Sequence, residues 1–86
     1  MKTYLLIYDE SIREKTLLSF LDSRKEILDW MTFLPSSVFL MSRHSLQHLT
    51  TIFRRKYPQA QFLITEIETE RTDGMLPEEC WEFINE

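Results

Sequence analysis

The feature that most constrains this chain is a short apolar run near its amino end, Tyr4–Tyr8, which stops abruptly at Asp9. A run this short, bounded by charge, is typical of a buried strand rather than a helix. The carboxylate of Asp9 would then lie at the rim of a sheet. We therefore interpret the downstream chain as elements that pack around this strand or gather at its carboxyl end.

The length and composition predict one globular domain, which we place over residues 1–86. Apolar residues make up 43% of the chain, enough to form a core. The single cysteine, Cys80, excludes an internal disulfide, and it favours a reducing, cytoplasmic setting. The run at Tyr4–Tyr8 is too short for a signal peptide or a membrane span, so we expect no membrane partner.

The charges are unevenly distributed around a net charge of −4. Between residues 45 and 58 the only charged side chains are Arg54, Arg55 and Lys56, whereas residues 59–86 carry eight acidic residues against one arginine. The basic triplet is a candidate nucleic-acid-binding surface, because cations can follow a phosphate backbone. A solvated helix end explains it equally well, since cations complement the carboxyl end of a helix dipole. Both interpretations remain open.

Two helices are predicted from apolar spacing and from their end signals. The first runs from about Ile12 to Lys25, and Ser11 followed by Glu14 is a capping-box signature at its start. The second follows Ser45, a predicted N-cap, and ends at Pro58.

Three further strands and a closing helix complete the predicted order. Trp30–Leu34 and Ser37–Ser42 flank a Pro-Ser turn and predict a hairpin. Gln61–Thr69 alternates with glutamate in its second half, which indicates a solvated face or a sheet edge. The closing helix is predicted to begin at Pro77.

The order β-α-β-β-α-β plus a short terminal helix predicts an α+β, ferredoxin-like sandwich. We expect the first and third strands to be central, parallel neighbours and the second and fourth to lie at the edges. The residues expected to contribute to the core are Leu5, Ile7, Leu17, Leu21, Val38, Leu40, Leu49, Ile52, Phe53 and Ile64.

Parallel central strands would bring the segment 9–11 together with the segment 42–45 at one rim. Asp9, Arg43 and His44 are therefore the candidate catalytic residues. In this hypothesis Asp9 is an oxygen ligand for Mg²⁺, Arg43 holds a phosphate bidentately and His44 transfers a proton.

A purely structural interpretation explains the same residues. Ser11 and Ser45 are helix caps, and Asp9 and Glu10 are acids that precede a helix amino end. His44 is then exposed and idle. One carboxylate is also an incomplete magnesium site, which needs Glu10, a backbone carbonyl or a second chain to complete it.

The segments YLLIYD, SSVFLMS and SLQHLTTIFRRKYPQAQFLITEIE resemble the small CRISPR-associated endonuclease of the spacer-acquisition complex. They are still more similar to its stand-alone bacterial relatives, the SinR-like proteins, and the virulence-associated protein D toxins share the same plan. The resemblance implies a ferredoxin-like homodimer in which Asp9 and its twin share a metal ion. It also implies a metal-dependent phosphodiesterase that acts on RNA or DNA.

The chain departs from this family in its acidic carboxyl-terminal segment and in the apolar residues that follow Val38 and Phe39. A non-catalytic interaction or regulatory module on the same fold is therefore the alternative function. A homodimer is also predicted independently of the resemblance, because the free edge of a long last strand invites pairing and small chains gain core by association.

Overall fold

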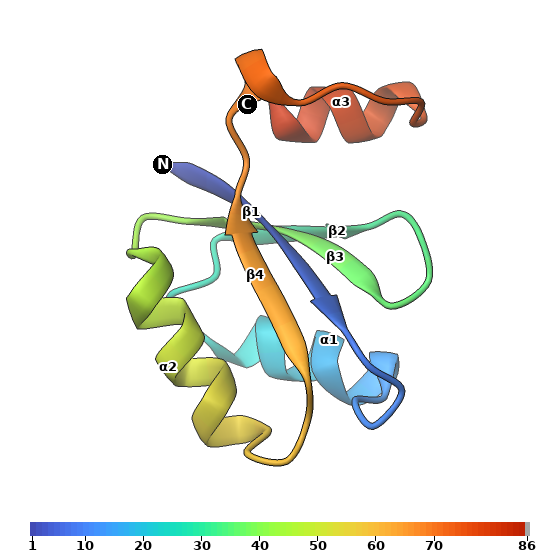
Figure 1. Cartoon of the computed structure of the whole chain (residues 1–86). Helices are drawn as coiled ribbons and strands as arrows, with labels where there is room; N and C mark the ends of the chain where they lie inside the picture. Colours follow the sequence, from blue (N-terminus) through green and yellow to red (C-terminus); the bar gives the residue numbers. More distant parts are fainter. Residues whose placement is uncertain (86) are drawn as a thin grey trace.

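The computed structural model describes residues 1–85 and shows an α+β fold, in which a four-stranded sheet carries helices on both faces (Figure 1). The predicted β-α-β-β-α-β order is confirmed. In chain order the elements are β1 (Lys2–Tyr8), α1 (Glu14–Ser23), β2 (Asp29–Thr32), β3 (Ser37–Ser42), α2 (Leu46–Lys56), β4 (Phe62–Glu66), the 3-10 turn η1 (Thr69–Arg71) and α3 (Glu78–Ile84).

The strand order in the sheet is β2-β3-β1-β4, and every neighbouring pair is antiparallel. The first and third strands are central neighbours, as predicted, but the prediction that they are parallel is wrong. Lys2 lies opposite Ser42, and Ile7 lies opposite Ser37. The helical crossover through α1 makes β2 run in the direction of β1, and the tight turn after β2 then reverses the chain. β3 must therefore run against β1.

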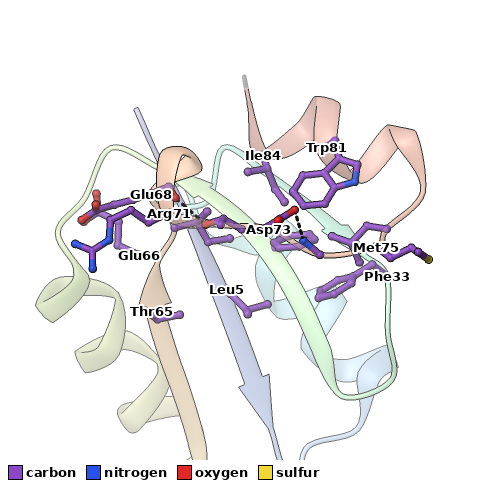
Figure 2. Close-up of a pocket in the computed structure, with 15 residues that line it drawn as sticks. Leu5, Phe33, Thr65, Glu66, Glu68, Arg71, Asp73, Met75, Trp81 and Ile84 are labelled. Carbon is purple, nitrogen blue, oxygen red and sulfur yellow. Dashed lines mark hydrogen bonds between the residues drawn. The ribbon is translucent and has the colours of Figure 1, made fainter.

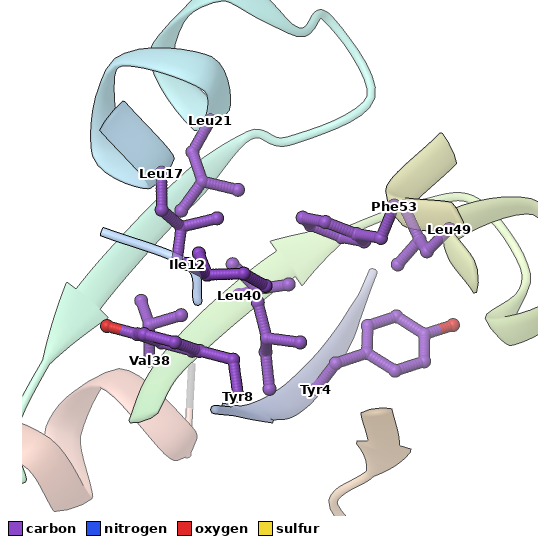
Figure 3. Packing of buried hydrophobic residues seen from close by; sticks show 10 residues of the cluster. Tyr4, Tyr8, Ile12, Leu17, Leu21, Val38, Leu40, Leu49 and Phe53 are labelled. Atoms are coloured by element: carbon purple, nitrogen blue, oxygen red, sulfur yellow. The ribbon is translucent and has the colours of Figure 1, made fainter. Parts of the chain in front are cut away.

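The first core lies between the sheet and the helices α1 and α2, where β1 contributes Tyr4, Leu6 and Tyr8 (Figure 3). Six of the predicted core residues are buried there, namely Leu17, Leu21, Val38, Leu40, Leu49 and Phe53. Ile52 and Ile64 pack against this core in partly buried positions. The prediction for Ile7 is wrong, because its side chain faces the other side of the sheet and is 44% exposed.

The opposite face of the sheet is covered in part by α3 (Figure 1). Phe83 and Ile84 of α3 pack with Phe39 and Met41 of β3 in a second, smaller cluster. Leu5, also predicted as core, packs against this second cluster from β1. The central strands are apolar on both faces because both faces are covered, at least in part.

Local hydrogen bonds set where the elements begin and end. Ser45 caps α2 by accepting the His48 N–H at 3.1 Å, as predicted. The capping-box prediction for Ser11 is wrong, because α1 begins at Glu14 and its N-cap residue makes no side-chain hydrogen bond. The last strand is also shorter than predicted, since β4 ends at Glu66.

Candidate functional site

The candidate catalytic residues lie at opposite ends of the sheet. Asp9 follows the carboxyl end of β1, where β3 begins, whereas Arg43 and His44 follow the carboxyl end of β3, opposite Lys2. The helix starts are separated in the same way, because α1 follows the end of β1 and α2 follows the end of β3 (Figure 1). The predicted single rim formed by segments 9–11 and 42–45 is therefore wrong, because it depended on parallel central strands.

The Asp9 carboxylate is engaged in hydrogen bonds within the chain. One oxygen, Oδ1, accepts the Ser11 N–H at 3.0 Å and the Ser11 hydroxyl, and the other, Oδ2, accepts the Gln61 N–H at 3.0 Å. The Ser11 hydroxyl, together with the Gln61 amide, lowers the pKa of the Asp9 carboxyl below its ordinary value. The Ser11 hydroxyl thus donates to Asp9, and Ser11 does not cap α1 because the helix begins at Glu14, with Arg13 at the N-cap position.

These contacts leave Asp9 little capacity to hold a magnesium ion. A carboxylate offers about four lone-pair positions, and three of those on Asp9 already accept hydrogen bonds. Within residues 1–85, no group of three or more His, Cys, Asp or Glu side chains is placed to hold a metal ion. The described part of one chain therefore does not fit the predicted Mg²⁺ site.

The other end of the sheet carries a cluster that the sequence did not indicate. Glu26, in the loop before β2, is buried and accepts two hydrogen bonds from the Arg24 guanidinium, at 3.1 and 2.9 Å. The His48 Nε2 lies 3.6 Å from the same carboxylate, and the His44 ring stacks on the His48 ring with centroids 4.4 Å apart. The hydrogen bonds from Arg24 are the main reason that the pKa of Glu26 falls to about 2.

The loop that carries Arg43 and His44 is held by two fully buried side chains. The Tyr4 hydroxyl donates to the His44 carbonyl oxygen at 2.7 Å, and the Ser42 hydroxyl accepts the His44 N–H at 3.0 Å. Both imidazoles are exposed beside the first turn of α2, so they are accessible to a ligand. We refer to Arg24, Glu26, His44 and His48 as the histidine cluster.

The basic triplet lies at the far end of α2 from the histidine cluster. Arg54, Arg55 and Lys56 form the last turn of the helix and are exposed. The chain then turns through residues 57–60 to Gln61, whose amide bonds to Asp9. The structure therefore places the triplet at the Asp9 end of the sheet and not beside Arg43 and His44.

A hollow opens between α3 and the uncovered part of the sheet (Figure 2). Its volume is about 470 Å³, and its apolar lining includes Leu5 of β1, Phe33 and Trp81. Met75, at its rim, is 98% exposed. The sequence showed that the residues of this hollow are apolar, but not that they would remain exposed to solvent. The alternation of apolar and polar residues does not indicate which part of a sheet a short helix will cover.

Comparison with protein-family models, with curated proteins and with solved structures finds no match to this chain. Among residues 1–85, no helix has the length and apolar character needed to cross a membrane.

Proposed function

We propose that this protein is a non-catalytic interaction module, built on the ferredoxin-like plan, that binds an apolar, basic segment of a partner protein. The element order and the antiparallel β2-β3-β1-β4 sheet support the plan. The observation that carries the function is the hollow under α3, whose apolar lining is open to solvent. Exposed apolar surface of this kind is typical of an interaction site.

The charge around the hollow supports the choice of partner. Glu68 and Asp73 line it together with one arginine, Arg71. The acidic residues of η1, α3 and their connections are all exposed, namely Glu68, Glu70, Asp73, Glu78, Glu79 and Glu82. A partner segment whose apolar side chains enter the hollow would therefore gain from flanking lysine or arginine residues.

The engagement of Asp9 supports a binding role over a metal-dependent one. Its carboxylate joins the end of β1 to the entry of β4. A residue used in this way has a structural role whether or not the protein binds a ligand. Cys80 offers no alternative nucleophile, because it is 3% exposed and burial raises the pKa of its thiol.

The test uses a synthetic peptide of about ten residues, the length of a long strand, that alternates leucine with lysine. A matched peptide alternates leucine with glutamate. In ¹⁵N-labelled protein, the leucine–lysine peptide should shift the amides of Leu5 and Ile67 and the Trp81 indole. The glutamate peptide should not, because the acidic rim repels it.

Charge reversal at the rim provides the matched variants. Asp73→Lys and Glu68→Lys should weaken binding of the leucine–lysine peptide, whereas Glu10→Lys, at the far end of the sheet, should not. Equal binding of both peptides, or shifts scattered away from the hollow, would contradict the proposal.

A second candidate function is a phosphodiesterase that acts on RNA or DNA, and the histidine cluster favours it. One neutral imidazole could take a proton from the attacking group, which is the 2′-hydroxyl in RNA or a water molecule in DNA, and a protonated one could give a proton to the leaving oxygen. Arg43, exposed beside His44, would hold the phosphate. Glu26 lies within ion-pair distance of His48 and would orient its ring.

Fluorescently labelled single-stranded RNA and DNA, incubated with and without Mg²⁺, distinguish the two functions. The interaction module cleaves neither substrate. A phosphodiesterase of the histidine cluster would lose its activity in His48→Ala and keep it in Asp9→Asn. Magnesium-dependent cleavage that is abolished in Asp9→Asn would contradict both proposals and restore the paired-aspartate hypothesis.

A further inference from the structure

β4 is an edge strand, and the structure shows which of its residues direct their backbone N–H and C=O groups toward the free side. It is the last strand in the sheet order, with β1 on one side only. The Ile67 N–H donates to the Thr3 carbonyl, and the Asp9 N–H donates to the Gln61 carbonyl. Residue pairs in an antiparallel ladder exchange bonds at every second position, so the odd-numbered residues of β4 bond to β1.

The even-numbered residues, Phe62, Ile64 and Glu66, therefore direct their N–H and C=O groups away from the sheet. Within residues 1–85, no loop or side chain donates to these groups or accepts from them. Natural edges are commonly protected by lysine, proline or a bulge, and β4 contains neither lysine nor proline. Its free edge is suited to pairing with another strand.

We propose that β4 pairs antiparallel with β4 of a second copy of this chain, with Ile64 on the two-fold axis. In this register Ile64 bonds to the partner's Ile64, and Phe62 bonds to the partner's Glu66. All three outward residues then exchange both of their backbone bonds. A register centred on Leu63 or Thr65 would pair fewer of the outward backbone N–H and C=O groups of β4. A register centred on Glu66 would place two glutamates face to face, which is unfavourable.

Charge complementarity supports this register. A second hollow, separate from the one under α3, lies beside the free edge, and both Arg54 of α2 and Phe62 of β4 line it. The partner's Glu66 would lie opposite Phe62, with Cβ atoms roughly 5 Å apart on the sheet face that carries α2. Within residues 1–85, neither Arg54 nor Glu66 forms an ion pair in the single chain. The dimer pairs Arg54 with the partner's Glu66 twice, once on each side of the axis.

The other face of the sheet gives an independent reason for pairing. Leu63 and Ile7 are cross-strand partners there, and they are 57% and 44% exposed. In the proposed register Leu63 and the partner's Leu63 are diagonal neighbours, whose Cα atoms are separated by roughly 7–8 Å. The Leu63–Ile7 pairs of the two copies thus form one continuous apolar strip across the interface, and dimerisation reduces the apolar surface that each copy exposes to water.

Charge exchange tests the pairing. Arg54→Glu and Glu66→Arg should each weaken the dimer at least about tenfold, because each variant alone places like charges together at both contacts. An equimolar mixture of the two variants should form a heterodimer, since every contact then joins opposite charges. Sedimentation equilibrium of the wild type, each variant and the mixture, over a wide concentration range, measures the association.

Arg55→Glu is the matched control, because Arg55 precedes Lys56 in the same exposed turn but does not line the hollow beside β4. It should leave the dissociation constant unchanged. Leu63→Lys should also weaken the dimer, and circular dichroism of each variant checks that the monomer is folded. A wild-type protein that remains monomeric overturns the proposal. So does a dimer that Arg54→Glu and Glu66→Arg leave intact or that their mixture does not restore.

Discussion

The Gln61 amide donates a 3.0 Å hydrogen bond to the Asp9 carboxylate across 52 positions of sequence. Asp9 also donates its own amide to the Gln61 carbonyl oxygen, so the two residues bond to each other through backbone and side chain. This pair closes the end of the β1–β4 ladder next to its last paired residues, Tyr8 and Phe62. The carboxylate therefore has a defined structural role at the position where the sequence predicted a metal.

Asp9→Asn should lower the stability of the fold. An asparagine in the same rotamer can still accept from Ser11 through its oxygen, but its nitrogen cannot accept the Gln61 N–H. The midpoint of urea unfolding should therefore fall, and it should fall equally with and without Mg²⁺. Glu10→Gln, which removes the same charge from an exposed neighbour, is the control and should leave the midpoint unchanged. A midpoint that Mg²⁺ raises in the wild type, but not in Asp9→Asn, would indicate a metal site.

The Arg24–Glu26 pair predicts a specific loss of stability in acid. The pKa of Glu26 in the folded protein is about 2, below its ordinary value of 4.5. A lowered folded pKa stabilises the fold above the unfolded value, and this contribution disappears as the pH falls from about 4.5 toward 2. Glu26→Gln should cost about 1.5–3 kcal/mol at neutral pH, the scale of hydrogen bonds to a charged group.

The difference in unfolding free energy between the wild type and Glu26→Gln should therefore narrow as the solution is acidified. Urea titrations at several pH values between neutral and about 3 measure this convergence. A constant difference across that range would show that the carboxylate charge is not what stabilises the loop.

Two tyrosine hydroxyls predict opposite outcomes for the same substitution. The Tyr4 hydroxyl donates to the His44 carbonyl, so Tyr4→Phe should cost about 1 kcal/mol. The Tyr57 hydroxyl is buried, and no described residue forms a hydrogen bond with it. The Thr16 hydroxyl lies nearby and donates to the Arg13 carbonyl, but it does not meet the geometry of a hydrogen bond with the Tyr57 hydroxyl. Tyr57→Phe should therefore be neutral or stabilising in thermal unfolding, and a loss equal to that of Tyr4→Phe would contradict this.

The order of the elements could be predicted from the sequence because each element is determined by local sequence signals. Alternation, the Pro-Ser turn and the Ser45 cap each act within a few residues, and each is present in the structure. The same holds for the helix stripe, since Leu17, Leu21, Leu49 and Phe53 are buried as their spacing predicts. Local rules of this kind need no knowledge of which strand lies beside which.

The candidate site could not be predicted, because it depends on strand direction and on long-range contacts. Assigning the wrong direction to β3 moved Arg43 and His44 to the wrong end of the sheet. The phase of β1 was ambiguous for a related reason, since a strand that is apolar on both faces does not show whether Tyr4 or Ile7 enters the main core. Nothing local to Glu26 indicated its contact with His48, 22 positions later.

The last prediction concerns α3, which is attached to the fold by a small cluster of its own. Phe83 is 6% exposed and lies 6.3 Å from Phe39 between ring centroids. Phe83→Ala should cost about 3 kcal/mol, the lower end for loss of a buried aromatic side chain, because this cluster is smaller than the main core. Much of that loss should appear as local detachment of α3, since the main core lies on the other face of the sheet.

The two tryptophans allow the two faces to be observed separately. Trp30 bonds to Asp22 beside the main core, whereas Trp81 belongs to α3. With 5-fluorotryptophan labelling, the Trp81 resonance in Phe83→Ala should move toward its unfolded position at lower urea than the Trp30 resonance. Leu17→Ala, in the main core, is the control and should move both resonances together, because its loss destabilises the whole sheet. Coincident transitions in Phe83→Ala would show instead that α3 and the sheet unfold as one cooperative unit.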